Sequence, residues 1–518
     1  MHGRNDVRLQ RRTLLRLQRR RRVGLLDPGS RFQHPFAARQ RGVPLGVPPG
    51  LRALPRVAAR APRERPARQF RPQPRPRGVV AGAGGERLHR QGEPLPLHLT
   101  GASPSDRSRP ARILARPASQ RLTSRLPRPA ETNALPTSPL NPVEVTLREI
   151  ELPLRERFII SSGWVENRRI LLLELRDESG ATAWSECVCG EQPNYSPETV
   201  DTARLALRRW LLPRVLGREL EGPEAVRPLL DAGVQGHPMA KAAIEMGIWG
   251  LSAEVEGVSL SELIGGTRDR VATGISLGLQ SSPAALVEKA REAVDRGYGK
   301  VKLKISPEKD IEYVGAVREA LGPERALAVD ANAAYTLDDA DRLAELDAFD
   351  LIMIEQPLAA GDLVRHARLQ ERLATPVCLD ESIVGPASCE DMLALGSGRI
   401  VNIKPGRVGG FRNSREIHDI SARAGVPVWC GGMLESGIGR AYNVALASMP
   451  NFRLPGDLSP SARYWERDVV SPEWTMDPDG FVTVPRDRPG LGVKVDIERV
   501  EALTRRSETI AGGGRVPA

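Results

Sequence analysis

The chain has 518 residues, of which 40% are hydrophobic, 27% charged and 4% aromatic, a composition typical of a globular protein with more than one domain. Its formal net charge of +11 is unevenly spread: residues 1–141 hold 30 arginines, no lysine and 7 acidic residues, whereas residues 142–518 hold 45 basic and 57 acidic residues. Because the body of the chain is acidic, a basic surface for nucleic acid is not supported for it.

Residues 1–141 also contain 20 of the 44 prolines. Proline breaks helices and like charges repel, so this segment is predicted to be a disordered Arg/Pro-rich extension. It could be a basic arm that binds RNA or membrane, or an organellar transit peptide. We favour a third interpretation, a stretch outside the natural protein, because arginine without lysine is typical of a GC-rich upstream region translated from too early a start.

Residues 142–268 are predicted to form an α+β domain. VEVTLREIELPL alternates apolar and polar residues as a half-buried strand does, and RRILLLELRD and ATAWSEC continue as strands. Residues 197–216 and 238–254 are predicted to be amphipathic helices. Residues 465–518 return to strand and turn patterns, and we expect them to pack on this domain and complete it.

Residues 269–464 alternate short apolar strands with helical runs such as PAALVEKAREAVDRG. This alternation, with a period of about 25 residues, predicts βαβ units and a parallel sheet. Eight strands of this kind favour a closed, TIM-like barrel over an open sheet, because a barrel leaves no edge strand.

The five cysteines show no CxxC pair, which argues against a disulfide scaffold or a zinc site and fits a reducing cytosol. No stretch of 18 apolar residues occurs, so we expect no membrane span. Gly-rich GGTRDR and GRVGG lack the Lys-Ser/Thr of a phosphate-binding loop, so nucleotide binding is unsupported. We therefore expect a cytoplasmic protein.

Three carboxylates end successive barrel strands: Asp330, Glu355 and Asp380, each 25 residues after the last. Such residues sit at one height at the mouth of a barrel, where active sites are built. Clustered carboxylates repel one another, and Mg²⁺ or Mn²⁺ would relieve this repulsion. The alternative is that all three only cap the helices that follow.

Lysines end two further strands of the barrel. Lys302 and Lys304 share one face of the second strand, because side chains alternate along a strand. Lys404 ends the sixth strand and so lies opposite them in an eight-stranded ring. A buried lysine near a cation and a second lysine should have a lowered pKa and act as a base. The alternative is that Lys302 and Lys404 only reach for solvent at the rim.

Together these groups predict metal-assisted proton abstraction next to a carboxylate. The cation would bind the substrate carboxylate and stabilise the enediolate while a lysine takes the α-proton. Histidine is not expected to be the base, since His237, His366 and His418 fall in predicted loops or helices as surface or capping groups.

These residues stand in motifs that resemble the enolase superfamily, muconate lactonizing subgroup. The matching stretches are KLK at 302–304, DAN at 330–332, EQPL at 355–358, LDES at 379–382, NIKPGRVGG at 402–410, WCGGMLESGIGRAYNVALASMPNF at 429–452 and LPGD at 454–457. The similarity runs from about residue 143 to 500. It implies an α+β cap on a (β/α)7β barrel.

Within that subgroup the motifs are most similar to o-succinylbenzoate synthases and N-succinylamino acid (N-acylamino acid) racemases. The resemblance implies a small carboxylate substrate and either a syn dehydration in menaquinone biosynthesis, which we favour, or racemisation, with one enzyme able to do both. Dipeptide epimerases of the superfamily carry Asp-x-Asp after the last strand, whereas Asp457 is followed here by Leu458 and Ser459. We also expect a homo-oligomer.

By position, the resemblance assigns roles to individual residues. Metal ligands would be Asp330, Glu355 and Asp380. Lys304 and Lys404 would be the acid/base pair, with Lys302 lowering the pKa of Lys304. Substrate-binding positions would be Ser276, Asn332, Arg407, Gly432 and Met433, and Arg407 matches an arginine of the racemase-capable branch. Residues 161–166 resemble a flexible loop that closes over the substrate.

Overall fold

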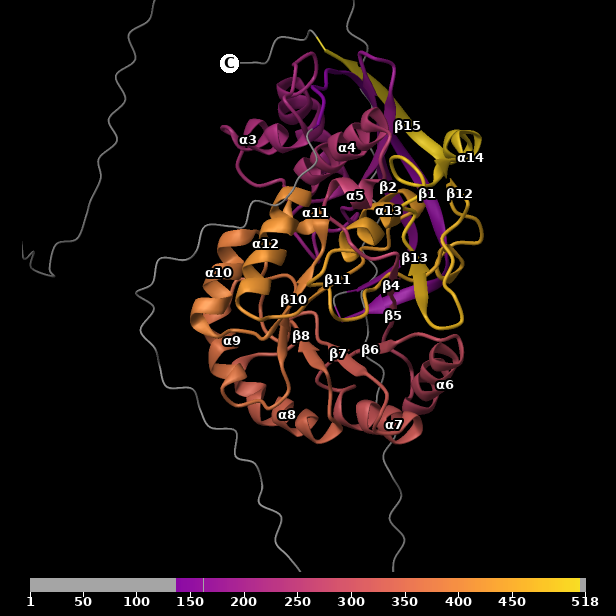
Figure 1. Cartoon of the computed structure of the whole chain (residues 1–518). Helices are drawn as coiled ribbons and strands as arrows, with labels where there is room; N and C mark the ends of the chain where they lie inside the picture. Colours follow the sequence, from indigo (N-terminus) through magenta and orange to yellow (C-terminus); the bar gives the residue numbers. More distant parts are fainter. Residues whose placement is uncertain (1–136, 162, 513–518) are drawn as a thin grey trace, which may run out of the picture. The chain divides into compact units, whose positions relative to one another are not determined.

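The computed structural model describes residues 137–161 and 163–512, which belong to one compact unit of the chain. The interpretations offered for the Arg/Pro-rich extension fall on residues 1–136 and lie outside the described residues. Two main sheets organise the described part, one antiparallel with four strands and one parallel with seven (Figure 1). None of the helices described combines the length and apolarity needed to cross a bilayer.

The antiparallel sheet joins the beginning and the end of the described chain. Its strands, in the order β15-β1-β2-β3, are Thr504–Ala511, Pro142–Ile160, Gly163–Asp177 and Thr182–Cys187. β15 pairs antiparallel with β1, so Thr504–Ala511 is part of this sheet. Helices α2 (Val200–Ala206) and α4 (Pro238–Glu256) lie against the sheet. The other helical elements of this part are η2 (Leu207–Leu211), η3 (Leu212–Arg214), η4 (Pro223–Ala225), α3 (Val226–Asp231) and α5 (Leu260–Leu263).

Helix α4 corrects one expectation from the sequence. It was expected to be amphipathic, yet every residue from Met239 to Ala253 is buried. The reason is its position: α4 contacts β3 on one side and the barrel helix α11 (Pro405–Val408) on another. A helix covered on all sides has no polar face.

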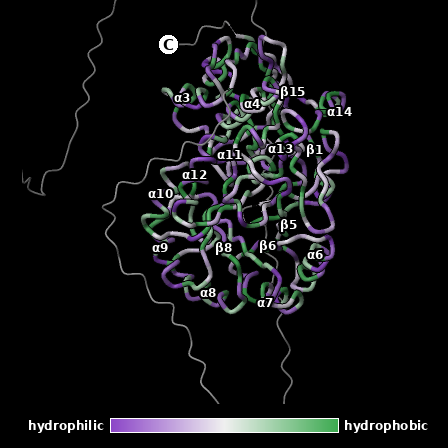
Figure 2. The backbone as a smooth tube through the Cα atoms, viewed as in Figure 1, coloured by the Kyte–Doolittle hydropathy of each residue, from purple (hydrophilic) through white to green (hydrophobic). Residues whose placement is uncertain are grey.

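The parallel sheet follows the order β11-β10-β9-β8-β7-β6-β5. Its strands are β5 (Gly274–Leu277), β6 (Lys300–Lys304), β7 (Leu327–Asp330), β8 (Met353–Glu355), β9 (Val377–Leu379), β10 (Ile400–Ile403) and β11 (Val428–Cys430). The helices between and after them are α6 (Pro283–Asp295), α7 (Ile311–Leu321), η5 (Leu337–Asp339), α8 (Ala340–Glu345), η6 (Leu346–Phe349), α9 (Leu363–Gln370), α10 (Pro386–Leu395), α12 (Phe411–Arg423) and α13 (Gly437–Ala447). Hydrophobic and hydrophilic segments alternate along α6, α7 and α8 (Figure 2), as expected of helices with one face on a barrel.

Residues 452–457 close the ring between its first and last strands. On one side the Gly274 amide donates to the carbonyl of Gly456 over 2.6 Å, and the Gly456 amide donates to Ala272 over 3.0 Å. On the other side Phe452 forms a parallel bridge with Val428. These contacts close the seven-stranded parallel sheet into the TIM-like barrel that the sequence predicted and that the resemblance implied as a (β/α)7β barrel.

Shorter elements complete the described chain. They are β4 (Arg270–Ala272), which pairs with β13 (Phe481–Thr483), β12 (Val470–Ser471), which pairs with β14 (Lys494–Val495), η7 (Ser461–Arg463) and α14 (Ile497–Leu503). All five cysteines are free and buried. The predicted domain boundaries near residues 268 and 464 stay predictions.

Candidate active site

The predicted site residues lie at the carboxyl ends of the parallel strands. Lys304, Asp330 and Glu355 are neighbours in register on β6, β7 and β8. Asp380 directly follows β9 and Lys404 directly follows β10. All five side chains are buried. One edge of the sheet therefore carries two lysines and three carboxylates.

Lys302 and Lys304 point into the barrel, as the strand alternation predicted. The Lys304 ammonium donates to Asp330 Oδ2 over 2.6 Å and to Asn332 Oδ1 over 2.6 Å. The Lys302 ammonium donates to Glu355 Oε2 over 2.6 Å and lies 3.3 Å from Asp330 Oδ2. The two lysines thus share one carboxylate oxygen of Asp330.

Lys404 lies on the far side of the ring with its own carboxylate. Its ammonium donates to Asp380 Oδ2 over 2.7 Å and to the hydroxyl of Tyr195 over 3.1 Å. The Tyr195 hydroxyl in turn donates to Asp380 Oδ1 over 3.0 Å, and its ring lies 4.6 Å below the same ammonium. Tyr195 belongs to the α+β domain, in the segment between β3 and α2, so the environment of Lys404 is built by both domains.

Arg407 contacts the same side chains that bind Lys404. Its guanidinium pairs with Asp380 and lies 3.3 Å from the Tyr195 hydroxyl. It also donates to the carbonyl of Ile383 over 2.9 Å. Arg407 therefore contacts the two groups that hold Lys404.

The charge state of the site follows from these contacts. Burial opposes ionisation of Asp330, but Lys304 and Lys302 outweigh it and hold the pKa of Asp330 well below its usual value. Burial opposes the charged form of Lys404, yet Tyr195 and nearby carboxylates raise the pKa of this lysine above its usual value. The pKa of Lys302 is raised in the same way by Asp457, Glu355 and Asp330.

A lysine pKa lowered beside a bound cation stays a prediction; among the protein groups themselves, the carboxylates and Tyr195 around Lys302 and Lys404 act in the opposite direction. The physical reason is that each ammonium contacts a carboxylate directly: Lys302 lies 2.6 Å from Glu355 and Lys404 lies 2.7 Å from Asp380. Among residues 137–161 and 163–512, no group of three or more His, Cys, Asp or Glu side chains has the arrangement of a metal-binding cluster. Each of the three carboxylates is bonded instead to the ammonium or guanidinium of a neighbouring side chain.

The predicted substrate-binding positions differ in how they contact the lysines and carboxylates of the site. Asn332 contacts Lys304, and its amide donates to Glu381 Oε1 over 3.2 Å. Ser276 is buried, and its hydroxyl donates to Asp457 Oδ2 over 2.9 Å inside the barrel. Gly432 and Met433 follow β11 and are half-buried. A Cβ on Gly432 would lie 3.0 Å from the carbonyl oxygen of Asp457, which explains a glycine there.

Sequence reasoning missed several residues of the site. Asn402 donates to Glu355 Oε1 over 2.7 Å, and Glu381 bonds to Asn332. Asn402 stands two residues before Lys404, so the period of two along β10 could have found it. Tyr195 gave no signal, because it lies in an irregular segment far from the barrel in sequence.

The histidines are outside this set of contacts, but two are not on the surface. His366 and His418 are buried, which corrects the surface part of their interpretation. Each accepts a backbone amide, of Leu358 over 3.1 Å and of Asn451 over 2.9 Å, so their role is to satisfy loop backbone.

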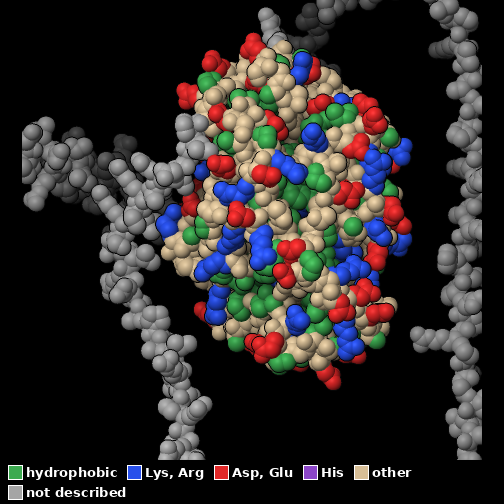
Figure 3. Space-filling view, turned by 45° about the vertical axis from the view of Figure 1, so that its right-hand side comes forward, with side chains coloured by type: hydrophobic (Ala, Val, Ile, Leu, Met, Phe, Trp, Pro, Cys, Tyr) green, Lys and Arg blue, Asp and Glu red, His purple; other side chains and the backbone are tan. Residues whose placement is uncertain are grey.

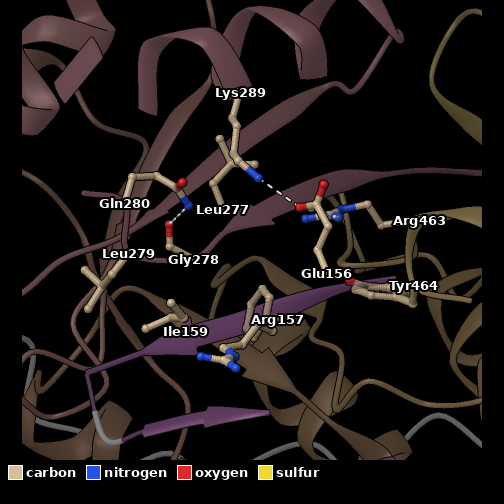
Figure 4. A pocket seen from close by; sticks show the side chains of 11 residues that line it. Glu156, Arg157, Ile159, Leu277, Gly278, Leu279, Gln280, Lys289, Arg463 and Tyr464 are labelled. Atoms are coloured by element: carbon tan, nitrogen blue, oxygen red, sulfur yellow. Dashed lines mark hydrogen bonds and ion pairs between the residues drawn. The ribbon is translucent and has the colours of Figure 1, made fainter. Parts of the chain in front are cut away.

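The β1–β2 hairpin reaches the strand ends of the barrel. Ser161 at its turn donates to the carbonyl of Ala331 over 3.4 Å, and the Leu279 amide donates to Ile159 over 3.0 Å. Residues 163–166, expected to lie in a loop, belong to β2. Beside the hairpin, Lys289 pairs with Glu156 over 2.8 Å at a cavity of about 100 Å³ (Figure 4). An ion pair between the domains thus holds the hairpin near the site.

The visible surface carries charges of both signs. Lys and Arg side chains are interspersed with Asp and Glu over the face shown in Figure 3. This mixture agrees with the acidic balance of residues 142–518 and gives no single-sign field for a polyanion on that face.

Comparison with known proteins identifies the families to which the two parts of this fold are similar. Residues 142–265 match the family described as mandelate racemase / muconate lactonizing enzyme, N-terminal domain, and residues 285–500 match enolase C-terminal domain-like. The chain is 45% identical over 361 residues to an o-succinylbenzoate synthase of Geobacillus stearothermophilus, covering 70% of this chain and 95% of that protein. It is 45% identical over 360 residues to an N-succinylamino acid racemase of Amycolatopsis sp, covering 70% and 96%.

A solved enolase superfamily structure from Listeria innocua is similar in fold. Its TM-score to this chain is 0.69, with 39% sequence identity over 72% of this chain and 99% of that one. Sequence similarity, the two matched domains and the barrel with its strand-end lysines and carboxylates all point to one conclusion. The chain belongs to the enolase superfamily, with the N- and C-terminal domains of its mandelate racemase / muconate lactonizing enzyme group.

Proposed function

We propose that this chain is an o-succinylbenzoate synthase, which removes water in syn fashion from 2-succinyl-6-hydroxy-2,4-cyclohexadiene-1-carboxylate in menaquinone biosynthesis. One observation carries the proposal: Lys304 and Lys404 end strands on opposite sides of the ring, each bonded to a buried carboxylate. Similarity to several synthases at 40–45% identity supports the same activity.

The residues divide the work between two faces of the substrate. Lys304, once released from Asp330 as the neutral amine, would take the α-proton and then give it to the departing hydroxyl, which leaves as water, because a syn elimination uses one face. Lys404, held positive by Asp380 and Tyr195, would contribute charge from the other face. Ser161 and the hairpin would cover the mouth and exclude water.

Asp330, Glu355 and Asp380 would hold Mg²⁺ or Mn²⁺. Their donor set fits such an ion, because all three are oxygen ligands from strand ends and Asp330 is held ionised. When bound, the cation supplies positive charge beside the substrate carboxylate and so favours loss of the α-proton.

N-succinylamino acid racemase is the second candidate, and Arg407 favours it. Racemisation needs a proton-exchanging group on each face, whereas dehydration needs only charge from Lys404. Arg407 contacts both Asp380 and the Tyr195 hydroxyl, so it can control how firmly these groups hold the Lys404 proton. Such control by the Arg407 guanidinium matters for racemisation, in which Lys404 must both donate and accept a proton.

The test compares both substrates with one preparation of metal-loaded protein. We expect o-succinylbenzoate formation with the higher kcat/KM, slower racemisation of N-succinylamino acids, and loss of both after EDTA with recovery on added Mg²⁺. Missing dehydration beside rapid racemisation would reverse the order of the two candidates. Full turnover after EDTA without added metal would contradict the metal assignment. A homo-oligomer in the cytoplasm is part of the same proposal.

A further inference from the structure

A third lysine lies beneath the two already described. Lys300 is on the same inward face of β6 as Lys302 and Lys304, and it is fully buried. Its ammonium lies 3.6 Å from the centre of the Trp429 ring and 3.9 Å from Asp457 Oδ1. It has no hydrogen-bond acceptor among the described residues. A buried charge is costly unless paired, so the Trp429 ring and the Asp457 carboxylate are what stabilise it.

Asp457 divides its two oxygens between Lys300 and Lys302. Oδ2 lies 3.0 Å from the Lys302 ammonium and accepts from Ser276 over 2.9 Å. Oδ1 faces Lys300 and has no hydrogen-bond donor among the described residues. The carboxylate thus joins the floor of the barrel to the lysine above it.

Lys302 has a second place where it could bind. Its ammonium is 3.3 Å from Asp330 Oδ2, the oxygen to which Lys304 donates over 2.6 Å. If Lys302 moved toward Asp330, it would compete with Lys304 for that oxygen. Two carboxylates act against this movement: Glu355, to which Lys302 donates over 2.6 Å, and Asp457, 3.0 Å away.

We propose that Asp457, anchored by Lys300 on the face of Trp429, is a positioning residue that with Glu355 keeps Lys302 off Asp330, so that Lys304 rests beside Asp330 until it is released to act on the substrate. The inference rests on the proposed function, in which Lys304 and Lys404 serve opposite faces of the substrate. Loss of Asp457 should disturb the Lys304 face and spare the Lys404 face, because the hydrogen bonds of Lys404 among the described residues go to Asp380 and Tyr195.

The experiment measures exchange of the α-proton in D₂O for each enantiomer of N-succinylphenylalanine, with the Mg²⁺-loaded full chain. Lys304→Ala identifies the enantiomer that Lys304 serves, as the one whose exchange is lost. Asp457→Asn should lower kcat for that enantiomer by about 10- to 10²-fold, the cost of misplacing a reacting group, with KM nearly unchanged. Exchange of the other enantiomer should fall by less than about 3-fold.

Variants of Lys300 separate charge from packing. Lys300→Met should lower exchange on the same face, and Lys300→Arg should restore part of it, because it keeps a positive charge beside Asp457. Lys241→Met is the matched control: Lys241 is also buried and ion-paired, with Asp231 over 2.8 Å, but lies in the α+β domain. Equal loss for both enantiomers would overturn the proposal.

A crystal structure of Asp457→Asn decides the matter independently of turnover. We expect the Lys302 ammonium to move toward Asp330 Oδ2 and the Lys304 ammonium to move away from it. Unchanged lysine positions would overturn the inference. If the wild-type protein exchanges neither enantiomer, the racemase candidate fails, and the lysine positions in the variant still test the role of Asp457.

Discussion

Residues within a few ångströms of one another carry most of the chemistry. Lys304 and Lys404 are both bonded to a strand-end carboxylate, yet their surroundings differ. Lys304 shares Asp330 with Lys302, whereas Lys404 has Asp380, the Tyr195 hydroxyl and Arg407 around it. Lys304 therefore shares its carboxylate with a second lysine, whereas Lys404 does not share Asp380 with another lysine among the described residues.

This difference predicts unequal tolerance of arginine. Lys404→Arg keeps the positive charge but releases a proton poorly, so it should lose racemisation by at least about 10²-fold and dehydration by much less. Lys304→Arg should disable both reactions, because Lys304 transfers protons in each. The measurement is turnover on both substrates with folded, metal-loaded protein. Equal loss of both reactions in Lys404→Arg would contradict a purely electrostatic role for Lys404 in dehydration.

At this scale the sequence predicted the barrel-borne residues well. A period of about 25 residues places strand ends, and alternation along a strand tells which side chains point inward, so Lys302 and Lys304 could be assigned to the inner face. Tyr195 could not be found in this way. Its approach to Lys404 depends on how two domains dock, and no local periodicity encodes docking.

Among the elements, the β1–β2 hairpin connects the α+β domain to the barrel mouth. Glu156 on β1 pairs with Lys289 on α6, and this pairing lowers the pKa of Glu156. Both side chains are partly exposed, so the pair contributes little to stability, of the order of 0.2–1 kcal/mol. Its effect should be felt in how firmly the hairpin is held over the site.

Glu156→Gln should therefore raise KM by roughly 2- to 5-fold with kcat little changed, because substrate binding must then order a looser hairpin. The increase should shrink at high ionic strength, where the wild-type pair is itself screened. Glu174→Gln is a matched control, since Glu174 pairs with Arg148 over 2.7 Å in the same antiparallel sheet. A similar rise in KM in the control would show that the effect is not specific to the hairpin.

Helix α4 shows where element-level prediction fell short. Its length and bounds followed from the apolar pattern, but its expected polar face does not exist. Small residues such as Ala242, Gly247 and Gly250 let the helix approach its neighbours closely: a Cβ on Gly250 would meet the Tyr442 hydroxyl at 2.6 Å. Burial on all sides is a property of assembly, which a single helical segment does not reveal.

Over the whole molecule, two glutamates of the α+β domain dock onto barrel helices. Glu186 accepts from the Ser436 amide at the start of α13, and Glu245 accepts from the Phe411 amide at the start of α12. Burial raises the pKa of each to about 7, against the hydrogen bonds they accept. The stability of the contact between the domains should therefore depend on pH.

The sign follows from the raised pKa. A glutamate that ionises near pH 7 when folded and near pH 4.5 when unfolded stabilises the fold fully below about pH 4.5, and this contribution is lost as pH rises through 7. For Glu186 the loss amounts to about 3 kcal/mol at most. Glu186→Gln should flatten the fall, because its carboxamide still accepts from Ser436 and cannot ionise. Melting temperatures of both proteins between about pH 5 and 8 test this, and parallel curves would contradict it.

The contribution of the residues before Thr137 can also be tested. Leu140 is buried and pairs with Leu220 through two backbone hydrogen bonds of 2.9 and 2.8 Å. A chain starting at Thr137 should keep full turnover and melting temperature, whereas one starting at Pro142 should melt lower because it loses these contacts. Loss of turnover in the chain starting at Thr137 would show that an earlier segment contributes to the enzyme.

The pairing of β15 with β1 has a consequence for engineering. The Gly512 amide donates to the Val143 carbonyl over 2.7 Å, so β1 begins beside the point where β15, the last described strand, ends. A short peptide could join them, and new termini could be opened in an exposed barrel loop. Such a circular permutant would keep the ring of strand-end groups intact while changing the order in which the two domains emerge during synthesis.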